Sequence, residues 1–153
     1  MNNEEYKALD EFELEPENWE QAERTEKTAF LAALANSKET DKDIKESLNE
    51  LERLAETAGI QVLGTYHQRR NAPERGTYFG KGFLTDLSRK MMQAQADILI
   101  VNDELGPSQA YNIERDYQIK VMDRTEVILD IFHKHAKTRE AKLQVHLAEL
   151  EYQ

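Results

Sequence analysis

The stretch DILIVN at residues 97–102 decides the fold class. Four consecutive apolar side chains, three of them β-branched, stand between an aspartate and an asparagine. A short apolar run without alternation is typical of a strand that is covered on both faces. A parallel sheet between layers of helices provides this environment, so we expect an α/β fold.

Segments with helical spacing lie on both sides of this strand. A helix is predicted over about residues 83–95, with apolar side chains on one side at Phe83, Leu84, Leu87 and Met91. Pro107 suits the first position of a second helix, which is expected to reach Tyr117. IKVMD at residues 119–123 then predicts another strand. This alternation of strands and helices favours right-handed crossovers and a parallel sheet.

The first half of the chain follows the same alternation. AFLAALAN at residues 29–36 is rich in alanine, which favours a helix, whereas its position in the chain favours a buried strand. Asp41 is the expected cap of a helix that Gly59 ends, with apolar side chains at Ile44, Leu48, Leu51, Leu54 or Ala55, and Ala58. IQVLGTY at residues 60–66 predicts a strand covered on both faces. We therefore expect a small four-stranded parallel sheet with helices on both faces.

The last 31 residues, DRTEVILDIFHKHAKTREAKLQVHLAELEYQ, predict one long helix. Its apolar side chains form a stripe at Ile128, Phe132, Ala136, Leu143, Leu147 and Leu150. The part near Phe132 is expected to lie on the sheet, but a rise of about 1.5 Å per residue carries Leu143 and the residues after it out of reach. A lone amphipathic helix is marginal in water, so an antiparallel partner helix is implied. We interpret the chain as an N-terminal fragment of a longer protein, truncated within a helical hairpin.

Charge is distributed unevenly along the chain, whose formal net charge is −10. Residues 1–27 contain ten acidic and three basic side chains, which leaves twenty acidic and seventeen basic ones in the rest. The first segment has one proline and little periodicity, so it is predicted to be a mobile or loosely docked extension. The predicted organisation is this acidic extension (1–27), an α/β domain (28–125) and the first hairpin helix (126–153).

Composition excludes several classes of site and location. The sequence contains no cysteine, which excludes disulfides, thiolate zinc sites and thiol nucleophiles. No apolar run approaches the roughly 20 residues that a membrane span requires, and the N-terminus does not read as a secretion signal. A cytoplasmic protein without a membrane partner is expected.

Several motifs resemble, in order and spacing, the N-terminal region of the HflX-type ribosome-associated GTPases. They are TAG at 57–59, GTYFGKG at 76–82, ELGPSQAYNIE at 104–114, VMDRTEVILDIF at 121–132 and HAKTREAKLQVHLAEL at 135–150. The resemblance covers residues 29–153 and leaves out the acidic extension. Phe83 departs from it, because the family usually has a second lysine at this position.

The resemblance implies a function for a longer protein. In the family, an α/β subdomain and a two-helix coiled coil precede a guanine-nucleotide domain, and the protein binds the large ribosomal subunit and acts in ribosome splitting, rescue or biogenesis. It implies GTP and magnesium as ligands of the full-length protein and none for this chain. The implied partners are the large subunit with its rRNA, the missing GTPase domain and the second hairpin helix. If the chain stands alone, self-association would cover the apolar stripe of the last helix. Motif residues without an assigned role are Gly80, Lys81, Gly82, Asp123 and Arg124.

The residues present do not predict catalysis. In GTYFGKG three residues rather than four separate the first two glycines, and Gly82 replaces the hydroxyl of a phosphate loop. We interpret this motif as a turn that opens a helix, with Lys81 on the surface. Acidic residues that end strands, Asp103, Glu104 and Asp123, are interpreted as caps and loop hydrogen-bond partners. The four histidines lack the spacing of metal ligands, so no metal site is predicted.

Two groups of basic residues are candidates for contact with rRNA, whose recognition depends on shape and backbone charge. One lies on the last helix and comprises His133, Lys134, Lys137, Arg139 and Lys142. The other, Arg69 and Arg70, falls in the expected loop after the second strand. A solvated helix face is the alternative interpretation. Two alternative functions stay open: a stand-alone α/β binding or regulatory module, and a nucleotide site at the sheet's carboxyl edge.

Overall fold

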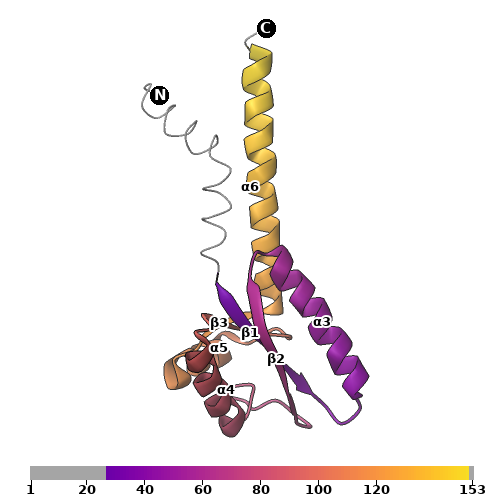
Figure 1. Cartoon of the computed structure of the whole chain (residues 1–153), viewed down its shortest axis with the longest axis vertical. Helices are drawn as coiled ribbons and strands as arrows, with labels where there is room; N and C mark the ends of the chain where they lie inside the picture. Colours follow the sequence, from indigo (N-terminus) through magenta and orange to yellow (C-terminus); the bar gives the residue numbers. More distant parts are fainter. Residues whose placement is uncertain (1–26, 152–153) are drawn as a thin grey trace.

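The computed structural model describes residues 27–151, and the side chains of residues 27–140. Strands and helices alternate along it (Figure 1): β1 (Thr28–Ala35), α3 (Asp41–Thr57), β2 (Gln61–Arg69), α4 (Lys81–Ala94), β3 (Ile98–Val101), α5 (Pro107–Tyr117), β4 (Lys120–Asp123) and α6 (Arg124–Glu151). The strands form one parallel sheet in the order β2-β1-β3-β4. The predicted four-stranded parallel α/β fold is therefore confirmed.

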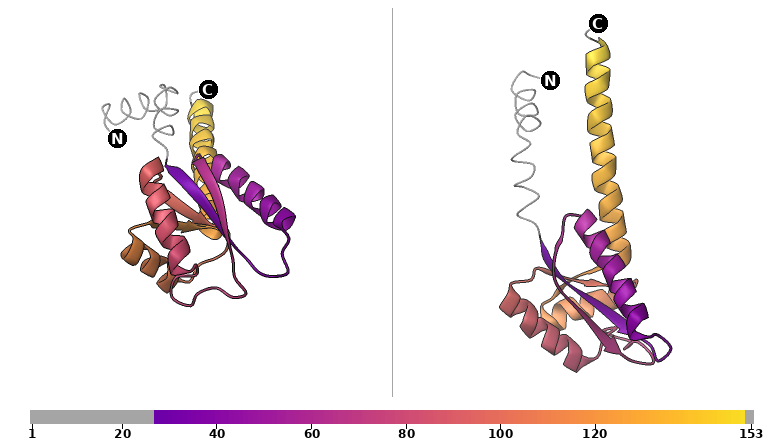
Figure 2. Two further views of the ribbon diagram at one scale, coloured as in Figure 1. Left: turned by 60° about the horizontal axis from the view of Figure 1, so that its bottom comes forward. Right: turned by 45° about the vertical axis from the view of Figure 1, so that its right-hand side comes forward.

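Helices cover both faces of the sheet, as predicted (Figure 2). On one face, α3 and the start of α6 pack against alternate side chains of β1 and β3, with Leu51 and Val127 fully buried. On the other face, α4 and α5 pack against the remaining side chains of the same strands, with Leu84 and Ile113 fully buried. The two central strands are thus buried on both sides, which explains the apolar run in DILIVN.

The alanine-rich stretch 29–36 forms a strand rather than a helix. β1 pairs with both β2 and β3, so its backbone groups are satisfied on both sides. Its position in the chain was the correct guide, because helix propensity is a weak preference that sheet pairing overrides.

The cap of α3 is Thr40, so the prediction of Asp41 was wrong by one residue. The Thr40 hydroxyl accepts a hydrogen bond from the Asp43 amide at 3.1 Å, and the Asp43 carboxylate accepts one from the Thr40 amide at 3.0 Å. This reciprocal capping box leaves Asp41 as the first helical residue. The predicted end is confirmed, because Gly59 follows the helix with a φ of 80°, a conformation that favours glycine.

The second strand differs from its prediction in burial and in length. β2 is an edge strand whose residues alternate between exposed and half-buried, so it is not covered on both faces. It also continues to Arg69, which was expected in a loop. Val62 packs on the α3 side of the sheet and Tyr66 on the α4 side, while the alternate residues of the strand stay exposed.

The next three elements lie close to their predicted positions. α4 begins at Lys81, two residues earlier than expected, because Gly80 provides the extended cap conformation. α5 has the predicted bounds, with Pro107 at its first position. β4 runs from Lys120 to Asp123.

The long final helix is confirmed as far as Glu151, and it projects from the α/β body (Figure 1). Val127 and Ile131 pack in the core cluster that α3 forms with the sheet, whereas Phe132 is 65% exposed, so the prediction that Phe132 lies on the sheet was wrong. The residues after Ile131 up to residue 140 are all exposed. Residues 124–131 are called the proximal part of α6 below, and residues 132–151 its projecting part.

Some predictions lie outside the described residues. The acidic extension falls on residues 1–26, and the side chains of the stripe from Leu143 onward are not among those described. The interpretation of the chain as a truncated hairpin stays a prediction. Within residues 27–151, no helix is long and apolar enough to cross a bilayer.

Candidate functional site

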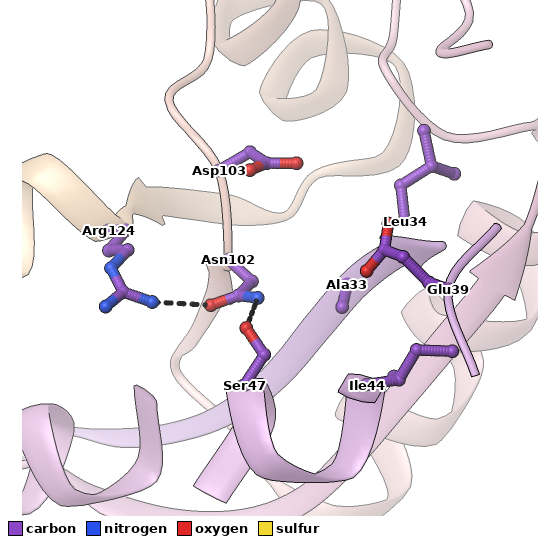
Figure 3. A pocket seen from close by; sticks show the side chains of 8 residues that line it. All are labelled: Ala33, Leu34, Glu39, Ile44, Ser47, Asn102, Asp103 and Arg124. Carbon is purple, nitrogen blue, oxygen red and sulfur yellow. Dashed lines mark hydrogen bonds between the residues drawn. The ribbon is translucent and has the colours of Figure 1, made fainter. Parts of the chain in front are cut away.

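The strand order creates a crevice at the carboxyl ends of β1 and β3. After β1 the chain passes to α3 on one face of the sheet, and after β3 it passes to α5 on the other face. The loops diverge at such a point, and open α/β sheets bind their ligands there. A pocket of about 330 Å³ occupies this position (Figure 3), lined by Ala33, Leu34, Glu39, Ile44, Ser47, Asn102, Asp103 and Arg124.

A chain of hydrogen bonds forms one wall of the pocket. The Asn102 side-chain nitrogen donates to the Ser47 hydroxyl at 2.7 Å, and the Arg124 guanidinium donates to the Asn102 side-chain oxygen at 3.2 Å (Figure 3). Arg124 also forms an ion pair with Glu50 of α3 at 2.6 Å. The pocket wall therefore links α3, the loop after β3 and the first residue of α6.

Asp123 is buried beside this wall and caps α6. Its carboxylate accepts hydrogen bonds from the backbone amides of Leu105 and Glu126, both at 2.9 Å. The interpretation of Asp123 as a cap and loop partner is confirmed. Partial burial, and then the nearby Asp123 carboxylate, raise the pKa of Glu126 above its ordinary value.

The GTYFGKG segment holds aromatic side chains in the core. Phe79 is fully buried, and Tyr78 is 6% exposed with a φ of 65°, a conformation that is rare for a bulky residue. The Tyr78 hydroxyl donates to the Asp103 carboxylate at the pocket rim. Burial of the ring, and then this hydrogen bond, raise the pKa of Tyr78. Asp103 is thus a loop hydrogen-bond partner, as interpreted from the sequence.

Gly80 is the cap residue of α4, and two side chains approach it closely. A Cβ at this position would lie 2.9 Å from both the Arg70 guanidinium and the Gln68 side-chain nitrogen. The Gly80 backbone amide donates to the Gln68 side-chain oxygen at 2.9 Å. Lys81 and Gly82 follow as exposed residues of α4. The motif is therefore a turn that opens a helix, with Lys81 on the surface, as the sequence predicted.

The two candidate arginines are engaged in contacts within the fold. Arg69 forms an ion pair with Asp41 at 2.5 Å and donates to the Glu39 carbonyl at 3.0 Å. The hydrogen bond and charge of Arg69 lower the pKa of Asp41. Arg70 pairs with Glu74 at 2.7 Å. Both guanidinium groups hold loops around the pocket end of the sheet.

The candidate bases on α6 are in two different situations. Lys134 donates to the Ala58 carbonyl at the end of α3 and pairs with Asp130 at 3.2 Å. His133, Lys137 and Arg139 are exposed, and no hydrogen bond or ion pair joins them to any side chain of residues 27–140. Lys142 lies in the same helix, with its side chain outside the described set. Within residues 27–140, no cluster of potential metal ligands occurs.

Sequence reasoning missed the pocket wall itself. Asn102 directly follows the most apolar strand, and a polar side chain at that point is a recognisable signal of a carboxyl-edge site. Ser47 sits on α3 between the buried Ile44 and Leu48, a polar residue close to the apolar face. Their pairing depends on how α3 packs against the sheet beside the end of β3, which residue spacing does not reveal.

Comparisons with known proteins agree on one family. The model of the family described as GTP-binding GTPase N-terminal matches residues 45–133. A GTPase HflX of Caldanaerobacter subterraneus is 43% identical over 133 residues, which is 87% of this chain and 30% of that protein. A GTPase HflX of Escherichia coli is 38% identical over 112 residues, which is 73% of this chain and 26% of that protein. The chain thus spans less than a third of the length of these relatives.

A solved structure shares the fold. It is a GTP-binding protein from the hyperthermophilic archaeon Sulfolobus solfataricus in complex with GDP, with a TM-score of 0.54 and 28% identity. The similarity covers 82% of this chain and 36% of that one.

Proposed function

We propose that this chain is the region with which an HflX-type GTPase binds the large ribosomal subunit. The chain belongs to the GTP-binding GTPase N-terminal family and matches the N-terminal region of HflX GTPases. GTP hydrolysis, with GTP and magnesium as ligands, is assigned to a domain outside these residues. Ribosome splitting, rescue or biogenesis in the cytoplasm is the proposed task of the full-length protein. The similarity to GTPases and the turn formed by GTYFGKG support this division.

The observation that carries the proposal is the exposed base cluster on the projecting part of α6. His133, Lys137 and Arg139 extend from a helix that stands away from the body, whereas Arg69 and Arg70 are occupied within the fold. Phosphate contacts require side chains that do not first have to give up an internal partner. The described part of α6 therefore fits contact with the RNA backbone better than the loop arginines do.

Cosedimentation with purified large subunits tests this proposal. A Lys137→Gln, Arg139→Gln double variant should bind more weakly than the unmodified chain, and the slope of log affinity against log salt should become shallower by about 0.7–0.9 per lost phosphate contact. Lys134 is left unchanged because it holds the end of α3.

A double variant of exposed bases on α3, Lys42→Gln with Lys45→Gln, is the matched control, since it removes the same charge from the body. It should keep the affinity and the salt slope. An equal loss of affinity in both variants would mean that only the net charge of the chain matters. Equal binding to small and large subunits would overturn the assignment to the large one.

A nucleotide site in the carboxyl-edge pocket is the second candidate, and the position of the pocket at the switch between β1 and β3 favours it. The carboxylates of Glu39 and Asp103 line the pocket together with Arg124, so we propose that it would hold a base or ribose rather than a bare phosphate. Calorimetric titration with GTP and ATP tests this. Ser47→Val should weaken any such binding, and no heat with either nucleotide would refute the site.

A further inference from the structure

Four side chains connect α3, the end of β3 and the start of α6 in a closed ring. Asn102 donates to Ser47 at 2.7 Å and accepts from Arg124 at 3.2 Å. Arg124 also forms the ion pair with Glu50 at 2.6 Å. Ser47 and Glu50 are three residues apart on α3, a spacing that places them on one side of that helix. We call these four residues the α6 clamp, because they tie the first residue of α6 to α3.

The residue before Arg124 attaches α6 to the body in a different way. Asp123 is 5% exposed, and its carboxylate accepts from the backbone amides of Leu105 and Glu126. These bonds fix the position at which the helix starts. Its direction depends on contacts further along or around the helix, which include the packing of Val127 and Ile131 in the α3 cluster and the polar contacts of the clamp.

Three members of the clamp also line the carboxyl-edge pocket (Figure 3). They are Ser47, Asn102 and Arg124, whereas Glu50 lies outside it. Among the eight side chains that line the pocket, Arg124 is the one cation. Its bond to the neutral Asn102 oxygen is at the long end of the usual range. A hydroxyl or carbonyl oxygen of an occupant can therefore replace that oxygen as the acceptor.

The ion pair of the clamp is also open to competition. The side chain of Arg124 is 29% exposed and that of Glu50 is 55% exposed. Ion pairs that water reaches are weak. A guanidinium group carries five donors in a fixed planar arrangement, so turning it toward a new acceptor moves its other donors as well. Binding of an occupant to Arg124 is thus incompatible with the present geometry of the pair with Glu50.

We propose that an occupant of the pocket changes the direction in which α6 leaves the body. This coupling rests on the nucleotide site proposed above and assigns its regulatory effect. An oxygen of the ribose or base replaces Asn102 on Arg124, the pair with Glu50 breaks, and α6 turns about its fixed start at Asp123. At about 1.5 Å per residue, Glu140 lies about 24 Å along the helix from Arg124, so a tilt of about 10° moves it by about 4 Å.

The coupling must act in both directions, because linkage between two equilibria is reciprocal. If an occupant opens the clamp, a clamp that is already open favours the occupant. Glu50→Ala opens the clamp without altering a residue of the pocket wall, and it should bind GTP or ATP about fivefold more tightly. Glu46→Ala, which removes an exposed carboxylate one turn earlier on α3, is the matched control and should keep the original affinity.

Residual dipolar couplings of backbone amides measure the direction of α6 relative to the sheet in the full chain. Saturation with GTP or ATP should tilt α6 by the angle given above in the unmodified chain and in Glu46→Ala. In Glu50→Ala the helix should already be tilted before the nucleotide is added, and the nucleotide should cause no further change. The direction of α4, which has no contact with the clamp, should stay constant in every sample.

Calorimetry on the same samples separates the coupling from the site on which it rests. Heat of binding without a change in the direction of α6 overturns the coupling and leaves the nucleotide site standing. A tilt on nucleotide addition that persists in Glu50→Ala also overturns it, because the clamp is then not the route. If neither nucleotide binds, both the site and the coupling fail. Ribosome binding by α6, which cosedimentation measures, is independent of all these outcomes.

Discussion

The proximal and projecting parts of α6 belong to one continuous helix but are stabilised differently. In the proximal part, Val127 is fully buried and Arg124 is held by α3 and Asn102. In the projecting part, every residue from Phe132 to residue 140 is exposed. Contacts with the body therefore fix where the helix starts and in which direction it leaves. The projecting part depends on its own backbone hydrogen bonds, and its side chains are available for a partner.

The largest expected contrast concerns amide hydrogen exchange. Backbone amides of Ile98–Val101 should exchange only through global opening, whereas amides after residue 133 of α6 open by local fraying. For a typical domain of this kind the difference is at least about 1000-fold. Exchange followed by NMR at low protein concentration measures it, and equal protection of the two segments would contradict the comparison.

Removing the Asp123 carboxylate should destabilise the body strongly. In Asp123→Ala the amides of Leu105 and Glu126 lose their acceptor, which should lower the free energy of unfolding by about 2–4 kcal/mol. Urea denaturation measures this change. Asp116→Ala, which removes an exposed carboxylate from α5, should stay within about 0.5 kcal/mol. An equal shift in both variants would show that the cap contributes little.

Truncating apolar side chains tests the two situations within the same helix. Val127→Ala removes two buried methyl groups and should cost about 1.5–3 kcal/mol. Leu129→Ala, two residues later, should cost about 0.5 kcal/mol or less, because the side chain is half exposed. Thermal unfolding of both variants provides the measurement. A larger loss for Leu129→Ala would mean that something covers this side chain.

A smaller effect is expected where the two parts of α6 meet. Lys134→Gln removes a cation from the carboxyl end of α3, where it binds the Ala58 carbonyl, and should cost about 0.3–1 kcal/mol. Lys137→Gln, one turn further, should leave the stability unchanged. Urea unfolding midpoints of both variants test this. Identical midpoints would mean that the contact between Lys134 and the Ala58 carbonyl contributes nothing to stability.

The smallest expected effect is a pH dependence at the start of α6. Because the pKa of Glu126 is raised in the folded chain, the folded state holds this proton more tightly than the unfolded state. Stability should therefore fall slightly as pH rises from the ordinary glutamate pKa through the folded value. Glu126→Gln should flatten this part of the plot of unfolding free energy against pH. An unchanged plot would mean that other carboxyl groups cause the pH dependence.

The pattern of elements was accessible from the sequence because it depends on local spacing. The run in DILIVN, Pro107 at the start of one helix, Gly59 after the end of another, and the length of α6 each predicted a feature that the structure confirms. The family resemblance was also available from short motifs. The cap of α3 and the ends of β2 and α4 were missed by one to three residues, since capping and sheet pairing are decided by neighbours.

The environment of each residue was less accessible. Phe132 belongs to the predicted apolar stripe of α6 and Val127 does not, yet Val127 is the buried one, because the way the helix packs on the body decides which side is covered. β2 has the composition of a central strand, yet its place at the sheet's edge leaves alternate residues exposed. Arg69 and Lys137 are both basic residues in the sequence, but among the side chains of residues 27–140 only Arg69 has an internal partner.

The sequence by itself determined the alternation of strands and helices, the long final helix and the family, because these depend on periodicity and on ordered motifs. The tertiary structure alone decided the strand order, the pocket between β1 and β3, and which bases are engaged within the fold, such as Arg69 and Lys134. The physical reason is that burial and pairing depend on contacts between residues far apart in the chain, such as Asn102 with Ser47 and Lys134 with Ala58.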